Sequence, residues 1–172
     1  MNRVYLRKPN LEDGDEFTQL MNLSVDSLYP WVYPPLMLEQ FERYIERFDE
    51  VFFFGYLVCL KGDDTILGLV NITQVMRYNV QSGFIAYYLG SRYEGKGYMQ
   101  EGVRLLLNHT FLSIGLHRLE ANIQPGNTRS IALAKKLGFK KEGYSEKFMQ
   151  INGIWKDHER WAILQDALMV KA

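Results

Sequence analysis

The sequence predicts an α+β fold in which helices flank a mixed central β-sheet. Several short runs alternate apolar with polar residues, as strands with one buried face do, whereas other segments carry apolar residues at helical spacing. The dipeptide Asn152-Gly153, between two strand-like runs, is a strong signal for a two-residue β-hairpin turn. The chain has 172 residues, 47% of them apolar, with no linker, repeat or low-complexity tract, so we expect a single domain over residues 1–172.

The N-terminal part begins with a short strand at residues 3–7, where apolar and polar side chains alternate. Asn10 follows as a helix N-cap, ahead of acidic residues that suit the positive end of a helix. Residues 28–35 contain three prolines and form an irregular, aromatic-rich loop, because proline restricts the backbone and removes a hydrogen-bond donor. Apolar residues at helical spacing then predict a second helix over residues 38–48.

The middle of the chain predicts three strands and a third helix. Residues 51–60 form one long apolar run and residues 65–73 a second, and the turn between them makes an antiparallel hairpin. A strand at residues 84–89 leads into a glycine-rich turn, and the helix that follows ends at Gly115.

The C-terminal part predicts a strand, a helix and a hairpin. Residues 117–123 alternate again, so that Glu120 and Asn122 share the polar face. Asn127 caps the next helix, which ends before Gly138. The final hairpin pairs residues 147–151 with the run from residue 154 onward.

The charge composition excludes some partners. The 20 basic and 20 acidic residues give a formal net charge of +0, so there is no general electrostatic reason to bind nucleic acid or a membrane. The single cysteine, Cys59, lies in an apolar run and favours core packing over a reactive thiol. No leader pattern or membrane-length apolar stretch occurs, so we expect a cytoplasmic protein. We expect either a monomer or a homodimer.

The chain is organised around residues 83–111, where a strand, a glycine turn and a helix follow one another. Gly90, Gly95 and Gly97 lie in the turn, and glycine lets the backbone reach positive φ and approach a ligand closely. The first N–H groups of a helix have no partner within it and carry partial positive charge. The pattern therefore predicts a site for an anionic ligand.

Three known turns resemble this one. The dinucleotide-binding pattern fails, because Gly95-Lys96-Gly97 has no glycine three residues further on. The Walker pattern fits from Gly90 through Lys96 but has Gly97 where a magnesium-binding hydroxyl should stand, which disfavours a Mg-nucleotide site; we expect no metal. The third pattern is Gln or Arg, two residues, Gly, one residue, then Gly or Ala, and residues 92–97 match it at every fixed position.

By this hexamer the chain resembles the GNAT superfamily of N-acetyltransferases, in which the turn binds the pyrophosphate of acetyl-CoA. The later motifs Asn127-Thr-Arg-Ser130, Lys136-Leu-Gly-Phe139 and Glu142-Gly-Tyr144 follow in the order typical of its RimJ and RimL branch. Members of that branch acetylate N-terminal amines of ribosomal proteins, and residues 151–158 look closest to RimJ. The resemblance implies a GNAT fold, with the sheet splayed at the acetyl-CoA site, and direct acetyl transfer to a primary amine.

The resemblance also implies the cofactor-binding residues. The turn would hold the pyrophosphate, and the strand before it would pair with the pantetheine arm. Asn127 would contact that arm while capping its own helix. Lys136, in a cluster of four lysines, is available to the 3′-phosphate, although a solvated helix end explains the cluster equally well. The expected set is Tyr87, Tyr88, Leu89, Arg92, Tyr93, Glu94, Gly95, Lys96, Gly97, Tyr98, Met99, Asn122, Asn127, Ser130 and Lys136.

Two catalytic roles follow from the chemistry of acetyl transfer. In the resembled family, a hydroxyl at the position of Ser130 protonates the departing thiolate, and Tyr144 is the competing acid. An α-amino group, with a pKa of about 8, is partly neutral at pH 7, so a weak base acting through a water is sufficient. Glu120 is the first candidate for that base and His158 the second, although a lone histidine in a strand is more often structural.

The acceptor site is expected at the aromatic loop, because the resembled family has its amine acceptor there. Tyr29, Trp31 and Tyr33 are the acceptor-binding candidates, and packing of these rings onto the core is the competing explanation. The acceptor that the resemblance implies is the N-terminal α-amine of a protein. A small amine such as a polyamine, amino sugar or antibiotic is the alternative within enzymes, and a non-catalytic acyl-CoA-binding sensor is the alternative outside them.

Overall fold

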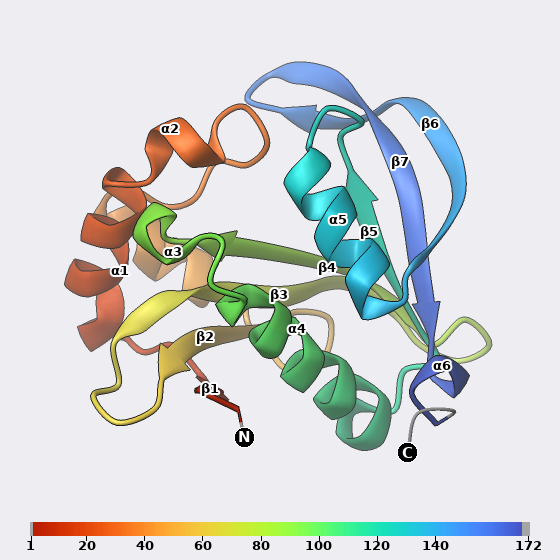
Figure 1. The fold of residues 1–172 in the computed structure, drawn as a ribbon, viewed down its shortest axis with the longest axis horizontal. Helices are drawn as coiled ribbons and strands as arrows, with labels where there is room; N and C mark the ends of the chain where they lie inside the picture. The colour runs from red at the N-terminus through yellow and green to blue at the C-terminus, as the bar shows by residue number, and fades with distance from the viewer. Residues whose placement is uncertain (1, 170–172) are drawn as a thin grey trace.

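The computed structural model describes residues 2–169, which form a seven-stranded sheet in the order β1-β2-β3-β4-β5-β7-β6 (Figure 1). Neighbouring strands are antiparallel except β4 and β5, which are parallel, so the predicted mixed sheet is confirmed. The strands are β1 Val4–Arg7, β2 Phe54–Leu60, β3 Ile66–Met76, β4 Ser82–Leu89, β5 Arg118–Ile123, β6 Lys140–Ile151 and β7 Ile154–Leu164.

Helices cover both faces of the sheet. The α-helices are α1 Gly14–Asn22, α2 Val25–Leu28, α3 Leu38–Ile45, α4 Tyr98–His109, α5 Thr128–Leu137 and α6 Asp166–Met169. Short turns of other helix types are η1 Leu11–Asp13, η2 Ser91–Tyr93 and the π-helical η3 Thr110–Ile114. One core packs α4 and α5 on the sheet through residues such as Leu106 and Ala134, and the other packs α1 and α3 through Phe17 and Phe41.

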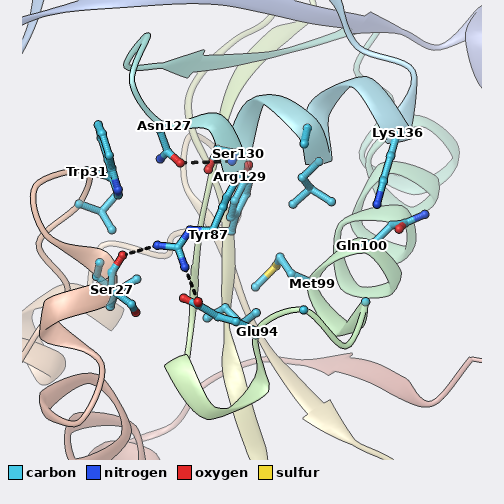
Figure 2. Close-up of a pocket in the computed structure, with 17 residues that line it drawn as sticks. Ser27, Trp31, Tyr87, Glu94, Met99, Gln100, Asn127, Arg129, Ser130 and Lys136 are labelled. Carbon is cyan, nitrogen blue, oxygen red and sulfur yellow. Dashed lines mark hydrogen bonds and ion pairs between the residues drawn. The ribbon is translucent and has the colours of Figure 1, made fainter.

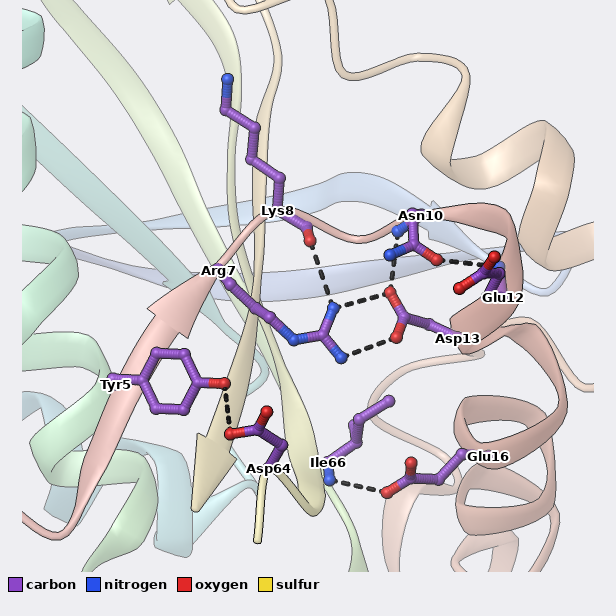
Figure 3. Close-up of polar contacts among 9 residues, drawn as sticks. All are labelled: Tyr5, Arg7, Lys8, Asn10, Glu12, Asp13, Glu16, Asp64 and Ile66. Atoms are coloured by element: carbon purple, nitrogen blue, oxygen red, sulfur yellow. Dashed lines mark hydrogen bonds and ion pairs between the residues drawn. The ribbon is translucent and has the colours of Figure 1, made fainter. Parts of the chain in front are cut away.

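The predicted helix start at Asn10 is confirmed, and Figure 3 shows its contacts. The Asn10 side chain accepts the N–H of Glu12 at 2.8 Å, and Asp13 accepts the N–H of Asn10 at 2.8 Å, which closes a reciprocal cap. Arg7 donates from Nη1 and Nη2 to the Asp13 carboxylate at 2.8 and 2.6 Å. The end of β1 and the start of the helical segment are therefore joined by a two-pronged ion pair.

The sheet opens in its middle. β4 and β5 pair at three positions, from Ser82 opposite Arg118 to Phe84 opposite Glu120. Beyond Phe84, β4 stays paired with β3 as far as Leu89, while β5 stays paired with β7 as far as Ile123. Each strand follows its other neighbour, and the twist of the two half-sheets moves them apart. The splay that the resemblance implied is confirmed.

Several predicted boundaries differ from the structure, among them the end of the second helix at Ile45 instead of residue 48 and the end of β3 at Met76 instead of residue 73. The strand expected at residues 51–60 begins at Phe54, because the Asp49 carboxylate accepts the N–H groups of residues 51–53 and holds them in a turn. The expected loop is preceded by the short helix α2, and β6 begins at Lys140 instead of residue 147. Within the described residues, no helix has the length and apolar character needed to cross a membrane.

Candidate functional site

A cavity of about 390 Å³ lies where β4 leaves β5, between α5, the start of α4 and the segment around α2 (Figure 2). Figure 2 shows Trp31 near one end of the labelled set and Lys136 with Gln100 near the other. The residues lining this α4–α5 cavity are Ser27, Leu28, Trp31, Val32, Tyr87, Leu89, Glu94, Gly95, Gly97, Met99, Gln100, Asn127, Arg129, Ser130, Ala132, Leu133 and Lys136.

The glycine turn presents unpaired backbone donors to the cavity. Gly95 and Gly97 have φ values of +71° and +82°, the left-handed region that favours glycine. A Cβ atom at Gly95 would meet no atom within 4 Å, so the space beside it is open. Within residues 2–169, none of the N–H groups of residues 95–100 finds a protein acceptor. These donors at the start of α4 form an anion-binding backbone.

Gly90 serves a different purpose from the one expected. Its φ of −61° is ordinary, and a Cβ atom there would collide with the side chain of Leu20. Gly90 therefore lets α1 pack closely under the turn, and only Gly95 and Gly97 give the turn its left-handed conformation.

Arg3 braces the glycine turn from outside. Its Nη2 donates to the carbonyl of Lys96 at 2.8 Å, while its own N–H donates to Glu101 Oε2 of α4 at 2.7 Å. In a trans peptide the C=O and N–H point in opposite directions, so this contact fixes the direction of the Gly97 N–H. The residue directly before β1 thus orients a donor of the turn.

The N-terminus of α5 forms the opposite wall. Asn127 Oδ1 accepts the Ser130 N–H at 3.2 Å, so the predicted N-cap is confirmed. Ser130 and Tyr87 of β4 both line the cavity. Burial raises the pKa of Tyr87, and the neighbouring Ser130 hydroxyl acts in the opposite direction. Ser130 therefore lies in the wall of the cavity, together with Tyr87 and Leu89 of the unpaired part of β4.

Arg129 crosses the cavity and was missed by sequence reasoning. Its guanidinium pairs with Glu94 of the glycine turn and donates to the carbonyl of Ser27 at 2.8 Å (Figure 2). The motif Asn127-Thr-Arg-Ser130 contains this residue, but no local signal gives the direction of its side chain. It ties α5, the turn and the end of α2 together.

The lysine cluster divides in three dimensions. Lys136 lines the cavity, whereas Lys135 lies over the Trp161 ring at 5.6 Å and Lys141 pairs with Glu159 at 2.6 Å. Lys140 is exposed. One lysine of the four thus faces the position expected for a phosphate.

Several expected cofactor residues lie outside the cavity lining. Arg92 and Lys96 stack on Tyr93, at 4.8 and 5.9 Å from its ring centre, and Arg3 stacks on Tyr98 at 4.5 Å. Tyr88 points to the other face of β4, toward α3. The remaining members of the expected set line the cavity, apart from Asn122.

Glu120 and Asn122 lie on the face of the sheet opposite α5, because Leu119, Ala121 and Ile123 between and beside them pack into the α4–α5 core. Glu120 pairs with Arg118 at 2.9 Å, and Arg118 also pairs with Glu142. Both polar atoms of the Asn122 side chain are buried without a partner in the described part of the chain. Buried amide groups normally make hydrogen bonds, so the Asn122 side chain can still donate and accept hydrogen bonds at the splay.

The two alternative catalytic residues have other partners. Tyr144 donates to Asp157 Oδ2 at 2.6 Å, and this bond raises the pKa of Tyr144. Tyr144 lines a separate hollow of about 310 Å³ instead of the α4–α5 cavity. His158 is buried, which lowers its pKa, and its Nδ1 contacts the carbonyl of Lys156 at 3.0 Å.

The aromatic loop borders the cavity through Trp31. This ring lines both the α4–α5 cavity and the hollow of Tyr144, and Gln124 Nε2 donates to the Trp31 carbonyl at 3.1 Å. Tyr29 and Tyr33 are exposed and meet edge to face, with ring centres 5.8 Å apart. Trp31 therefore separates the cavity from the hollow of Tyr144, and the other two rings of the loop are exposed to solvent.

The donor set fits a long anionic ligand with an amide-bearing arm. Unpaired N–H groups at the glycine turn suit a diphosphate, and the edge of β4 beyond Phe84 has no strand partner on the β5 side within residues 2–169. Among those residues no group of three or more His, Cys, Asp or Glu could hold a metal ion, and the expectation of no metal stays a prediction.

Comparison with known proteins identifies the family. Residues 3–140 match the acetyltransferase (GNAT) domain. YjcK of Bacillus subtilis, a probable N-acetyltransferase, is 36% identical over 153 residues, 89% of this chain and 83% of that protein. The ribosomal protein uS5-alanine N-acetyltransferase of Escherichia coli is 34% identical over 107 residues, 62% of this chain and about half (54%) of that protein.

Structural similarity covers more of the chain. The ribosomal-protein-S5-alanine acetyltransferase from Vibrio fischeri has a TM-score of 0.85 and 26% identity, over 96% of this chain and 95% of that one. A spermidine N(1)-acetyltransferase of Vibrio cholerae is 26% identical over 100 residues, 58% of this chain and 57% of that protein. Similar proteins thus differ in the amines their names state.

The chain belongs to the GNAT family of acetyltransferases. It is an N-acetyltransferase that uses acetyl-CoA, and the predicted resemblance to RimJ-like enzymes is confirmed.

Proposed function

We propose that this enzyme transfers the acetyl group of acetyl-CoA directly to the N-terminal α-amine of a protein, with ribosomal proteins as the first class to test. The observation that carries the proposal is the likeness over 96% of the chain to a ribosomal-protein-S5-alanine acetyltransferase. The open splay supports direct transfer, because a thioester on one side of β4 and an amine on the other can meet there.

The proposed cofactor contacts follow the donor set of the cavity. The N–H groups of residues 95–100 bind the diphosphate, the free edge of β4 pairs with the pantetheine amides, and Asn127 and Lys136 contact the arm and the 3′-phosphate. In this assignment the thioester lies near Ser130 and Tyr87, at the point where the strands separate.

The proposed reaction needs modest acid and base catalysis. The neutral amine attacks the thioester carbon, a C–N bond forms, and the C–S bond breaks. Glu120 takes the amine proton through a water, and Ser130 gives a proton to the thiolate. An α-amine suits a weak base, because its pKa of about 8 leaves it partly neutral at pH 7, whereas a lysine at about 10.4 is almost fully charged.

A polyamine acceptor is the alternative, since a spermidine acetyltransferase is among the similar proteins. Against it, the lining of the two hollows on either side of the aromatic loop includes Arg43, Arg47 and Lys156 but one acidic residue, Asp157. A polycation would require several carboxylates there.

The cytoplasmic location and a monomeric or homodimeric state also stay predictions.

The test is a panel of acceptors assayed for thiol release and for acetylated product by mass spectrometry. It contains peptides with free N-termini, the same peptides with a blocked N-terminus and an internal lysine, spermidine, and an amino sugar. We expect acetylation of free N-termini and little of the blocked peptides. Preferred acetylation of spermidine or of lysine would overturn the proposed acceptor, and tight CoA binding without thiol release for any amine would indicate a sensor.

A further inference from the structure

A charged hollow lies on the face of the sheet opposite the α4–α5 cavity. It measures about 630 Å³ and is bounded by α3, the loop at residues 33–36 and β4. Tyr88 lines this α3 hollow while Tyr87 lines the cavity, because successive residues of a strand point to opposite faces. β4 is therefore the wall that the hollow and the cavity share.

Two arginines carry all the formal charge of this lining, Arg43 and Arg47. Neither makes an ion pair with a carboxylate in the described part of the chain. Arg43 Nε donates to the backbone carbonyl of Glu39 at 3.1 Å, and the Arg47 guanidinium lies 4.8 Å from the Tyr44 ring centre. Both guanidinium groups thus keep N–H donors free for a ligand.

The rest of the wall is rigid and neutral. Asn71 Nδ2 donates to the Tyr44 hydroxyl, and the rings of Tyr44 and Tyr88 pack with their centres 6.1 Å apart. Burial raises the pKa of Tyr44 and of Tyr88, so both phenols keep their protons at neutral pH. A carboxylate entering the hollow would meet two fixed phenol rings and two guanidinium groups, with no competing negative charge in the lining.

The hollow is within reach of the proposed reaction point. The thioester is assigned near Tyr87, and Tyr88, the next residue of β4, lines the α3 hollow on the opposite face of the strand. Each extended peptide residue adds about 3.3 to 3.6 Å, so two to four residues beyond the amine span roughly 7 to 14 Å. An amine at the splay can therefore belong to a peptide whose second to fourth side chain enters the α3 hollow.

We propose that Arg43 and Arg47 bind a carboxylate of the acceptor, so that the enzyme selects protein N-termini with Asp or Glu among the residues that follow the amine. This inference rests on the proposed function and narrows it to a class of N-termini. Paired guanidinium groups suit carboxylates, which they can bind with two parallel hydrogen bonds. The same charges repel a polyamine.

The test compares peptide pairs that differ by Asp or Asn at positions two to four, with free N-termini, at fixed ionic strength. We expect kcat/KM to be about 10-fold or more higher for the Asp peptide, as for a charge-assisted hydrogen bond. The double variant Arg43→Gln with Arg47→Gln should lose this preference while its acetyl-CoA affinity and melting temperature stay unchanged. Arg104→Gln, an exposed arginine of α4 on the other face, is the matched control and should keep the preference.

Binding of the same peptides, measured by fluorescence anisotropy with CoA present, distinguishes failure of the carboxylate site from failure of the proposed N-terminal acceptor. Acetylation of both peptides at equal rates, with equal binding, overturns the carboxylate site and leaves the N-terminal acceptor intact. Arginine-dependent preference in binding without acetylation of any N-terminus supports the site and overturns the acceptor. If the double variant lowers kcat/KM equally for the Asp and the Asn peptide, the arginines act on folding or on general electrostatics, and the inference is also overturned.

Discussion

At the scale of single residues, the question is which side chain protonates the departing thiolate. Ser130 lines the cavity beside Tyr87, whereas Tyr144 lines another hollow and donates a hydrogen bond to Asp157. The geometry favours Ser130 of the two acids that the sequence left open. Acid catalysis is a partial requirement, since a thiol of pKa about 8.5 is already a fair leaving group.

We predict that Ser130→Ala lowers kcat by about 10-fold, below the roughly 100-fold or more typical of full general acid catalysis, and leaves acetyl-CoA affinity within about twofold. Tyr144→Phe, which keeps the ring, should retain most of the activity. Steady-state kinetics with a saturating acceptor and titration with acetyl-CoA measure both effects. Unchanged kcat for Ser130→Ala, or a larger loss for Tyr144→Phe, would assign the proton transfer elsewhere.

At the scale of elements, the turn between β4 and α4 is the proposed binding site for the diphosphate of the cofactor. Its conformation comes from Gly95 and Gly97, its orientation from the Arg3 contact to Lys96, and its close support by α1 from Gly90. Three separate elements therefore hold N–H donors that the protein itself leaves unpaired in residues 2–169.

Gly95→Asp should weaken acetyl-CoA binding by at least about 100-fold, because a carboxylate in the open space would repel the diphosphate and face the same donors. Gly115→Asp is the matched control. Gly115 also has an open Cβ position and a φ of +76°, and it follows η3, the π-helical turn after α4. Both variants carry similar backbone strain, so similar melting temperatures with different acetyl-CoA affinities, measured by calorimetry, would support the site. Equal acetyl-CoA affinities of the two variants would show that the turn does not bind the cofactor.

At the scale of the whole molecule, the two half-sheets share a short seam between β4 and β5, and the C-terminal half is secured by ion pairs. Hydrogen bonds from Arg118, Tyr144 and Lys141 hold the pKa of Glu142, Asp157 and Glu159, respectively, below the usual carboxyl range. All three carboxylates lie on β6 or β7. Acid should therefore affect the half that carries α5 and the wall of the cavity.

The unfolding free energy is expected to fall as the pH drops. The unfolded glutamates have their ordinary pKa of 4.5, so the stabilisation is fully present above that pH and is lost as the pH falls through the lower folded values. Glu142→Gln should lower stability by at most about 1 kcal/mol near pH 7, since the pair is partly exposed, and by less near pH 3. Urea unfolding at several pH values measures this dependence.

The control for that series is Glu39→Gln, an exposed carboxylate of α3 that makes no ion pair within the described residues. It should not change the pH dependence of unfolding. A Glu142→Gln curve parallel to that of the unchanged protein at every pH would contradict the role given to Arg118.

The sequence by itself determined the fold class and the elements, because both depend on local signals. Alternation and helical spacing located each strand and long helix, although β6 begins at Lys140 instead of residue 147. The caps at Asn10 and Asn127 and the turn at Asn152-Gly153 follow from side-chain and backbone preferences. The glycine turn was readable for the same reason, since positive φ at Gly95 and Gly97 is a property of those residues.

Only the tertiary structure decided which of these residues share a site. It separated Lys136 from its three neighbours, turned Tyr88 and Asn122 away from the cavity, brought Arg129 across to Glu94, and assembled Arg43 and Arg47 into a hollow behind β4. Such placements depend on how two half-sheets diverge and on contacts between residues far apart in the chain. No local pattern records those contacts, because they form only when the elements pack.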